Sequence, residues 1–350
     1  MAMRRSFVIA AAAMGVLIGG SWLTWSLLAR QGQGTLSQVP LNIQTPTPPA
    51  FIMALDDSGS MIWEVLNNTR DGVYRWVEST SGNRRIGFYN SGGTPYGFGE
   101  GSGQNYHYLT PNYTRSGESA IPPFDVFGFA RSPDINGAYF DPRDIYPAWK
   151  TGYTDPTRAV FKTINPAAAP VDPRPSGTPG FKNYTVNLTE DSWRIENGWR
   201  YQLRSGMVIP VGTMMEDLRN AGTNQAPAPR CGMTSANTDG SGARSGWRRV
   251  SSAITLTAAC EAAIRYYPAT FFLTEPSSLP ASFGYRATPV AVTTGASPNV
   301  GGRPGTIYKY EIRPDNFSST EQYTAAMQNF ANWFSFYRVR REAVIGAATN

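Results

Sequence analysis

Three oxygen-bearing side chains stand at alternate positions near residue 56 and could together bind a divalent cation. Asp56, Ser58 and Ser60 follow directly on the apolar run at residues 51–55. A continuous apolar run of this kind is typical of a strand buried on both faces of a parallel sheet. Ligands of open α/β sheets bind beyond the carboxyl ends of such strands, and Mg²⁺ prefers oxygen ligands. The spacing therefore predicts a metal site, with a plain polar turn as the alternative.

A catalytic function is not expected from the remaining reactive residues. His107 is the single histidine and there is no G-x-S-x-G elbow, so a Ser-His-Asp hydrolase lacks its signature. One histidine rules out a histidine-rich metal site, and two cysteines cannot by themselves fill a four-ligand zinc site. Adjacent Asp56 and Asp57 tend to face opposite ways at a strand end, which disfavours a carboxylate pair. We therefore expect a non-enzymatic protein that acts by binding.

The amino terminus has the pattern of an exported protein. Arg4 and Arg5 precede a stretch at residues 7–29 that is apolar except for Gly, Ser and Thr. A charged region followed by an apolar region is typical of a signal peptide, and this stretch is also long enough to span a bilayer. Residues 1–30 are therefore predicted to be a signal peptide or a membrane anchor. Residues 31–49, rich in Pro, Thr and Gln, are predicted to be a linker.

Cysteine usage and charge agree with an exported, loop-rich chain. The two cysteines, Cys231 and Cys260, suit an oxidising compartment. A disulfide between them would close a loop of about 30 residues and contribute about 3.6 kcal/mol in a chain-entropy treatment; two unpaired buried thiols are the alternative. The net charge of +6 comes from 31 basic and 25 acidic residues. The basic residues are scattered, so no nucleic-acid partner is expected.

Hydrophobic patterns predict regular elements around a loop-rich middle. Residues 67–123 are dense in Gly, Asn, Tyr and Ser and show little helical periodicity. The Asn197-Gly198 pair predicts a hairpin turn between strands near residues 193–195 and 199–201. We expect a helix over residues 251–267, followed by strands at residues 269–273 and 306–312.

The clearest helical pattern in the sequence lies near its carboxyl end. Ser318-Ser319-Thr320-Glu321 is typical of a capping box. Apolar and aromatic side chains then recur at spacings of three, four and seven, which predicts one buried face. That face comprises Tyr323, Met327, Phe330, Trp333, Phe334, Tyr337 and Val344. Arginines lie toward the carboxyl end of this helix, where the helix dipole favours cations.

The D-x-S-x-S spelling of Asp56, Ser58 and Ser60 resembles the metal-ion-dependent adhesion site of von Willebrand factor A domains. The resemblance implies that the two hydroxyls bind Mg²⁺, or Mn²⁺ or Ca²⁺, directly, and that the Asp acts through water. One coordination position would stay open for a carboxylate of the partner. The implied fold is α/β or α+β, with an incomplete von Willebrand factor A-like (Rossmann-like) core. A very long, loop- and β-rich insertion would separate its first strand from its first helix.

This resemblance divides the chain into successive segments after the signal or anchor and the linker. Residues 50–66 would form the first strand and metal-site loop of the A-like domain, residues 67–317 the insertion, and residues 318–348 the amphipathic helix. In A domains a Thr and an Asp from later strands complete the metal site. We therefore expect either a truncated or split version of the domain or a variant that completes its sheet differently.

The chain from Phe51 onward also resembles the amino-terminal region of PilY proteins, the tip-associated adhesins and assembly factors of type IV pili. The similarity lies in the export signal, the D-x-S-x-S strand, the helical residues 329–338 and the intervening stretches 138–149, 206–213 and 266–272. It implies a role in pilus biogenesis, surface adhesion and twitching motility. The location would be the periplasm, outer surface or pilus tip of a Gram-negative bacterium.

The same resemblance implies the partners. These are minor pilins or the pilus tip, and a ligand on a host or abiotic surface. Membrane contact is expected only through the amino-terminal segment. The alternative is a secreted carbohydrate-binding protein that uses exposed Tyr and Trp side chains of the Gly-rich insertion as stacking platforms.

Overall fold

The structure is a computed structural model, and it describes part of the chain. The described residues are 58–66, 73–76, 104–110, 120–150, 161, 163–174, 183–193, 200–216, 231–293 and 306–349. They all belong to the second of two units into which the chain divides, Asp56–Asn350. The predicted signal or anchor, the linker, the strand at residues 51–55 and Asp56 lie outside the described residues.

Short antiparallel strands make up the sheets in the described ranges. Two sheets have three strands, in the orders β12–β14–β13 and β7–β9–β8, and the other strands pair as β1–β2, β3–β4, β6–β10 and β5–β11. The bounds are β1 Tyr74–Trp76, β2 Gln104–Tyr106, β3 Ala169–Pro170, β4 Thr185–Val186, β5 Tyr201–Leu203, β6 Val208–Ile209, β7 Met214–Glu216, β8 Thr238–Asp239, β9 Trp247–Val250, β10 Ile254–Thr255, β11 Cys260–Ala262, β12 Thr270–Leu273, β13 Val290–Thr293 and β14 Thr306–Glu311.

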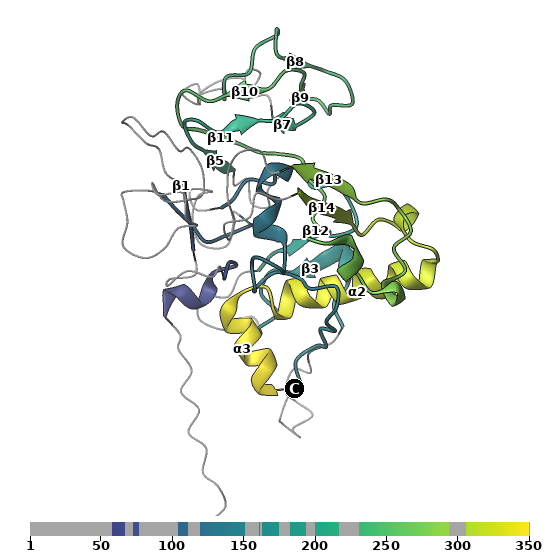
Figure 1. Cartoon of the computed structure of the whole chain (residues 1–350). Coiled ribbons are helices and arrows are strands. Elements are labelled where there is room, and N and C mark those ends of the chain that lie inside the picture. Colours follow the sequence, from purple (N-terminus) through teal and green to yellow (C-terminus); the bar gives the residue numbers. More distant parts are fainter. Residues whose placement is uncertain are drawn as a thin grey trace, which may run out of the picture. The chain divides into compact units, whose positions relative to one another are not determined.

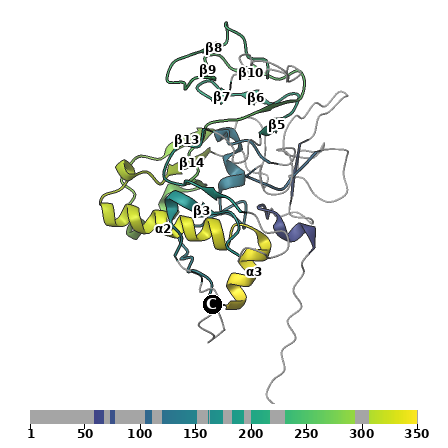
Figure 2. The ribbon, with the colours of Figure 1, turned by 180° about the vertical axis from the view of Figure 1, so that it is seen from behind.

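The α-helices of the described residues are α2 (Thr320–Phe336) and α3 (Arg340–Thr349). Six 3₁₀ helices accompany them in the same ranges: η1 Gly59–Ile62, η2 Asp125–Arg131, η3 Pro166–Ala168, η6 Pro276–Ser278, η7 Ala281–Phe283 and η8 Pro314–Asn316. Neither α2 nor α3 is both long and apolar enough to cross a bilayer. Helices and antiparallel sheets occur together, so the class is mixed α+β (Figures 1 and 2).

The predicted strands at residues 269–273 and 306–312 are confirmed as β12 and β14. They are antiparallel neighbours, with Phe271 opposite Tyr310 in the register. All four residues of β12 are buried, and the rings of Phe271 and Tyr310 stack with their centroids 5.0 Å apart. Phe140 packs edge-on against Phe271 and against Phe330 of α2. The sheet and α2 therefore share one aromatic core.

The predicted terminal helix is confirmed over α2, but it does not continue unbroken. Ser319 caps α2 by accepting a hydrogen bond from the Gln322 amide, at 3.3 Å. Tyr337 departs from helical geometry, with φ −135° and ψ −9°, and α3 begins only at Arg340. The break shifts the helical phase, so Val344 is 37 % exposed instead of continuing the buried face.

Polar side chains of α2 hold irregular segments of the insertion against the helix. The Asn332 side chain donates to the Tyr146 carbonyl at 2.9 Å and accepts from the Ile164 amide at 3.2 Å. Ser335 donates to the carbonyl of Pro170 in β3 at 2.8 Å, and β3 lies beside α2 in both views (Figures 1 and 2). The last turns of α2, residues 330–336, are buried. They are enclosed by loops that depend on α2 for hydrogen bonds.

The helix predicted over residues 251–267 is wrong, because this stretch forms β10 and β11. Its burial alternates: Ile254 and Leu256 are buried around exposed Thr255, and Cys260 and Ala262 around exposed Glu261. Alternation of period two belongs to strands. β10 and β11 complete the pairing of β6 and β5, so tertiary pairing overrides the helical preference of an alanine-rich sequence.

The same segment pairs with the described flanks of the predicted hairpin. Tyr201 lies opposite Ala262 in the β5–β11 ladder, and Ser192 forms an antiparallel bridge with Tyr266. The predicted turn at Asn197-Gly198 lies outside the described residues.

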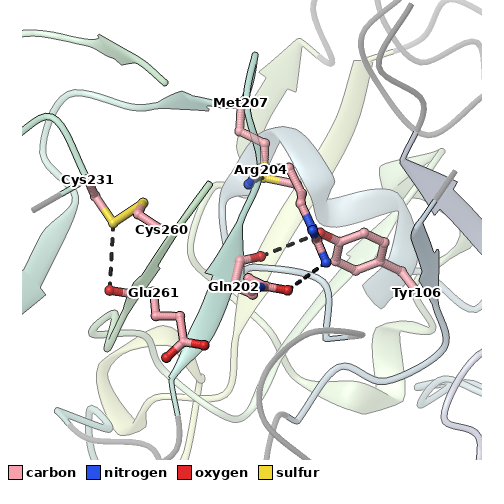
Figure 3. Close-up of a disulfide and its surroundings, with 7 residues drawn as sticks. All are labelled: Tyr106, Gln202, Arg204, Met207, Cys231, Cys260 and Glu261. Atoms are coloured by element: carbon pink, nitrogen blue, oxygen red, sulfur yellow. Dashed lines mark hydrogen bonds between the residues drawn. A yellow bond between two sulfur atoms is a disulfide. The ribbon is translucent and has the colours of Figure 1, made fainter. Parts of the chain in front are cut away.

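The disulfide between Cys231 and Cys260 is present. Their Cα atoms are 5.4 Å apart, and the two residues are 3 % and 4 % exposed. Figure 3 shows the bond at the first residue of β11, next to Glu261, which lies opposite Gln202 of β5. The link joins the β5–β11 pair to a segment 29 positions away in sequence.

We expect the double variant Cys231→Ser/Cys260→Ser to lose about 3–4 kcal/mol of unfolding free energy, because the open chain regains loop entropy. Urea denaturation followed by Trp fluorescence measures the change. Reductant should lower the midpoint of the native protein and leave that of the variant unchanged. A variant as stable as the native protein would contradict the expectation.

Candidate functional site

Two of the three predicted metal ligands lie together on the surface. Ser58 immediately precedes η1 and Ser60 lies within it. Their hydroxyl oxygens are 2.9 Å apart and share a hydrogen bond at an exposed position. A Cβ added at the intervening Gly59 would meet nothing within 4 Å, so the turn is open to solvent. The structure therefore brings the two hydroxyls together and does not place the third ligand, Asp56.

The donor set of this turn suits a hard cation only in part. Hydroxyl oxygens are ligands that Mg²⁺ and Ca²⁺ accept, but two neutral hydroxyls leave a divalent charge uncompensated. Within the described ranges, no three His, Cys, Asp or Glu side chains gather as metal ligands. A cation site at this turn would need a carboxylate such as that of Asp56.

The residues that follow η1 fix this turn to the interior. The Trp63 ring stacks on His107, with centroids 4.8 Å apart and planes at 27°. The Glu64 amide donates to the His107 carbonyl at 2.9 Å. Arg340 lies over the Trp63 ring at 5.0 Å and donates to the Val65 carbonyl at 2.6 Å. Segments from three distant parts of the sequence thus meet directly behind the hydroxyl turn.

The centre of this meeting point is the buried carboxylate of Glu64. One of its oxygens accepts hydrogen bonds from the backbone amides of Leu109 and Thr110, at 2.6 and 2.8 Å. The other lies 3.0 Å from the guanidinium of Arg338, and the two side chains are 0 % and 2 % exposed. The carboxylate therefore links the hydroxyl turn, residues 109–110 and the junction of α2 with α3.

Arg338 is held on its other sides by α2 and by the residue that follows β3. Its guanidinium lies 4.0 Å over the Phe334 ring and donates to the Val171 carbonyl at 3.1 Å. The break in the helix at Tyr337 precedes this residue, so Arg338 enters the interior instead of following the helical face. In both views η1, drawn in purple, lies near α3 (Figures 1 and 2).

Sequence reasoning missed Glu64, Arg338 and a second buried acid, Glu342. The position of Arg338 near the carboxyl end of the predicted helix indicates only a favourable interaction with the helix dipole. Glu342 is 0 % exposed, and no described residue gives its carboxylate oxygens a hydrogen bond. No pattern in the sequence distinguishes these buried charges from solvated ones.

Two titratable groups of this region have strongly shifted pKa values. Burial, aided by the positive charge of Arg340, lowers the pKa of His107 to about 4, so its ring is neutral at pH 7. Burial raises the pKa of Glu342 to about 8, with Arg338 and Arg341 opposing the rise and Asp172 adding to it. Glu342 is therefore mostly protonated at neutral pH.

We expect Glu64→Gln to destabilise the protein by about 3–5 kcal/mol, because it leaves the buried Arg338 charge without its partner. The matched control is Glu216→Gln, whose pair with Arg200 (2.9 Å) is partly exposed and should be worth at most about 1 kcal/mol. Urea denaturation of both variants measures the difference. Equal, small losses in the two variants would show that the buried pair does not stabilise the fold.

We expect Glu342→Gln to gain stability relative to the native protein as pH rises. Between pH 4.5 and about 8 the native carboxyl keeps its proton in the folded state and loses it on unfolding, so native stability falls with pH. Glutamine has no proton to lose. The difference should grow by a few kcal/mol between pH 5 and pH 8.

Urea midpoints of native protein and variant, compared at each pH, test this. His107 also makes stability depend on pH: because its pKa is lowered in the folded state, stability falls as pH falls from 6.5 toward about 4. This effect is the same in native protein and variant, so it cancels in the comparison. A difference that does not vary with pH would contradict the protonated state of Glu342.

Comparison with known proteins identifies no relative of this chain. No family model, no curated protein and no solved structure matches the chain.

Proposed function

We propose that this chain is a non-enzymatic type IV pilus biogenesis and surface-adhesion factor of the PilY kind. It binds a ligand carboxylate through a divalent cation, Mg²⁺ or in its place Mn²⁺ or Ca²⁺, held by Asp56, Ser58 and Ser60. The observation that carries this proposal is the exposed pair of hydroxyls, 2.9 Å apart, within the D-x-S-x-S sequence motif.

The separation of the two hydroxyls supports a shared cation. In an octahedral Mg²⁺ site with ligands at 2.0–2.1 Å, neighbouring ligand atoms lie about 2.9 Å apart. Ser58 and Ser60 have this separation without a change in the turn. A cation could therefore replace their mutual hydrogen bond and keep both oxygens in place.

The buried contacts behind the turn support a site of fixed geometry. Glu64 and Arg338 hold the segment after η1 from the interior, and Arg340 holds it through the Trp63 ring and the Val65 carbonyl. A preordered loop lowers the entropic cost of binding a ligand. In the proposed incomplete A-like core, α2 takes the place of the first helix, and residues 67–317 are the insertion.

The proposed setting follows from the same resemblance and from the amino-terminal pattern. The chain is exported through residues 1–30 and acts in the periplasm, on the outer surface or at the pilus tip of a Gram-negative bacterium. Its partners are minor pilins or the pilus tip and a carboxylate-bearing ligand on the colonised surface. The disulfide agrees with an oxidising compartment.

We expect Ser58→Ala/Ser60→Ala and Asp56→Ala each to weaken Mn²⁺ binding at least tenfold, because each removes direct or water-mediated ligands. Calorimetric titration of the purified exported protein measures the affinity. The matched control is Ser251→Ala/Ser252→Ala, which changes another exposed serine pair and should bind as the native protein does. Unaltered Mn²⁺ affinity in the first two variants, or no Mn²⁺ binding by the native protein, would refute the cation site.

The biological part of the proposal is tested in the bacterium with the same variants. We expect Ser58→Ala/Ser60→Ala to reduce surface attachment or piliation while protein abundance stays equal to that of the control. Deletion of the gene should reduce pilus number, twitching or attachment. A deletion that leaves all three unchanged would refute the pilus role.

A further inference from the structure

A cleft of about 390 Å³ lies apart from the hydroxyl turn. Its walls include η2, the loop at residues 210–213, residues 264–267 and the charged side of β14. Its volume falls within the range of about 300–1,000 Å³ that is usual for small-molecule sites. Neither Ser58 nor Ser60 belongs to it, so this site is independent of the proposed cation site.

Ionised side chains of alternating sign form a continuous row in the cleft. In order, the row is Asp125, Lys309, Glu311, Arg313, Asp191 and Arg265. The Lys309 ammonium lies 3.0 Å from Asp125 and 3.1 Å from Glu311. The Arg313 guanidinium lies 2.6 Å from both Glu311 and Asp191, and Arg265 pairs with the other oxygen of Asp191.

The period of a strand explains how three members of the row come together. Lys309, Glu311 and Arg313 occupy alternate positions along β14 and its extension, and alternate residues of a strand share one face. The residues between them, Tyr310 and Ile312, are 2 % and 0 % exposed. One face therefore joins the core and the other presents charges to the cleft.

The charges of the row balance, and its central members are held in their ionised forms. Burial tends to raise the pKa of Glu311, but Lys309 and Arg313 outweigh it and hold that pKa below its usual value. The pKa of Asp191 is lowered in the same sense by Arg313 and Arg265. Despite burial, Asp125 and Glu311 raise the pKa of Lys309. Arg131 also lines the cleft, but it is 7 % exposed and its guanidinium donates to the Pro122, Leu109 and Ile121 carbonyls. A simple anion or cation that binds the row would have to displace an existing partner, which makes an ionic ligand a poor fit there.

We infer that this cleft binds a neutral, polyhydroxylated ligand of the carbohydrate class. A hydroxyl both donates and accepts hydrogen bonds, so neighbouring sugar hydroxyls can donate to Glu311 or Asp191 and accept from Arg313. Hydrogen bonds to ionised groups are the stronger ones. No charge pair has to be broken, because a carboxylate oxygen accepts more than one hydrogen bond.

Aromatic side chains back the walls of the cleft. Tyr266 is partly exposed in the lining and can contact an apolar sugar face, whereas Phe124 and Phe272 are 3 % and 2 % exposed. Arg313 lies 3.8 Å over the Tyr267 ring. That stacking holds the guanidinium plane in place while its edge is hydrogen-bonded to Glu311 and Asp191. The donors and acceptors of the row are therefore preordered for a ligand.

The test is calorimetric titration of the full chain with neutral oligosaccharides: maltotriose, cellotriose, chitotriose and lactose. Val211→Trp adds bulk at a cleft residue that is 62 % exposed, so folding should be kept; its control is Val208→Trp, 45 % exposed and outside the lining. Glu311→Gln removes one acceptor charge, and Glu216→Gln is its control, because that acid also pairs with an arginine but lies outside the cleft.

We expect at least one neutral oligosaccharide to bind. Val211→Trp and Glu311→Gln should weaken its affinity tenfold or more, about 1.4 kcal/mol, while the two controls bind as the native protein does. Affinity that persists in Val211→Trp would place the ligand elsewhere and overturn the inference. Failure of every neutral oligosaccharide to bind the folded protein would do the same, as would binding of a sulfated heparin tetrasaccharide alone.

The two proposals fail separately. The cleft variants should leave Mn²⁺ affinity unchanged, and Ser58→Ala/Ser60→Ala should leave oligosaccharide affinity unchanged, because the two sites share no residue. Loss of one activity without the other therefore identifies which proposal is wrong.

Discussion

Buried backbone needs hydrogen-bond partners even where it belongs to neither helix nor strand, and in the described part of the protein buried side chains supply many of them. Asn136 is wholly buried and uses its whole amide. Its oxygen accepts from the Leu66 and Ala138 amides, and its nitrogen donates to the Glu64 and Ala130 carbonyls. One such side chain replaces several bonds of a sheet ladder, so a chain with short strands can still fill a core.

Glu64 is a charged side chain that satisfies buried backbone in the same way. Its carboxylate satisfies two backbone amides and also pairs with Arg338. A buried pair of this kind contributes little net stability compared with apolar residues, but losing one partner is costly. Its effect is therefore to select one arrangement: the segment after the hydroxyl turn has to meet the break between α2 and α3. The position of Ser58 and Ser60 depends on residues almost three hundred positions later in the chain.

The elements that the sequence predicts correctly are those determined by neighbours in sequence. β12 is a short apolar run, β14 alternates, and α2 has both its cap and its apolar face. For the two cysteines, the sequence leaves both a disulfide and two unpaired thiols open. The elements predicted wrongly depend on distant partners: residues 251–267 are strands because β5 and β6 pair with them. The helix breaks at Tyr337 where Arg338 turns toward Glu64, a contact that no local pattern reveals.

The two candidate sites differ in charge balance, and this difference decides what each can bind. The hydroxyl turn offers uncharged oxygen atoms. Without a carboxylate, their binding free energy does not offset the hydration free energy that a divalent cation loses. The row of ion pairs in the cleft offers charges that already compensate one another, so it gains most from a ligand that donates and accepts together. Under the two proposals together, one chain would engage a glycosylated, carboxylate-bearing surface through two independent contacts. Two linked contacts give a higher overall affinity than either alone, because the second binding event becomes intramolecular once the first has formed.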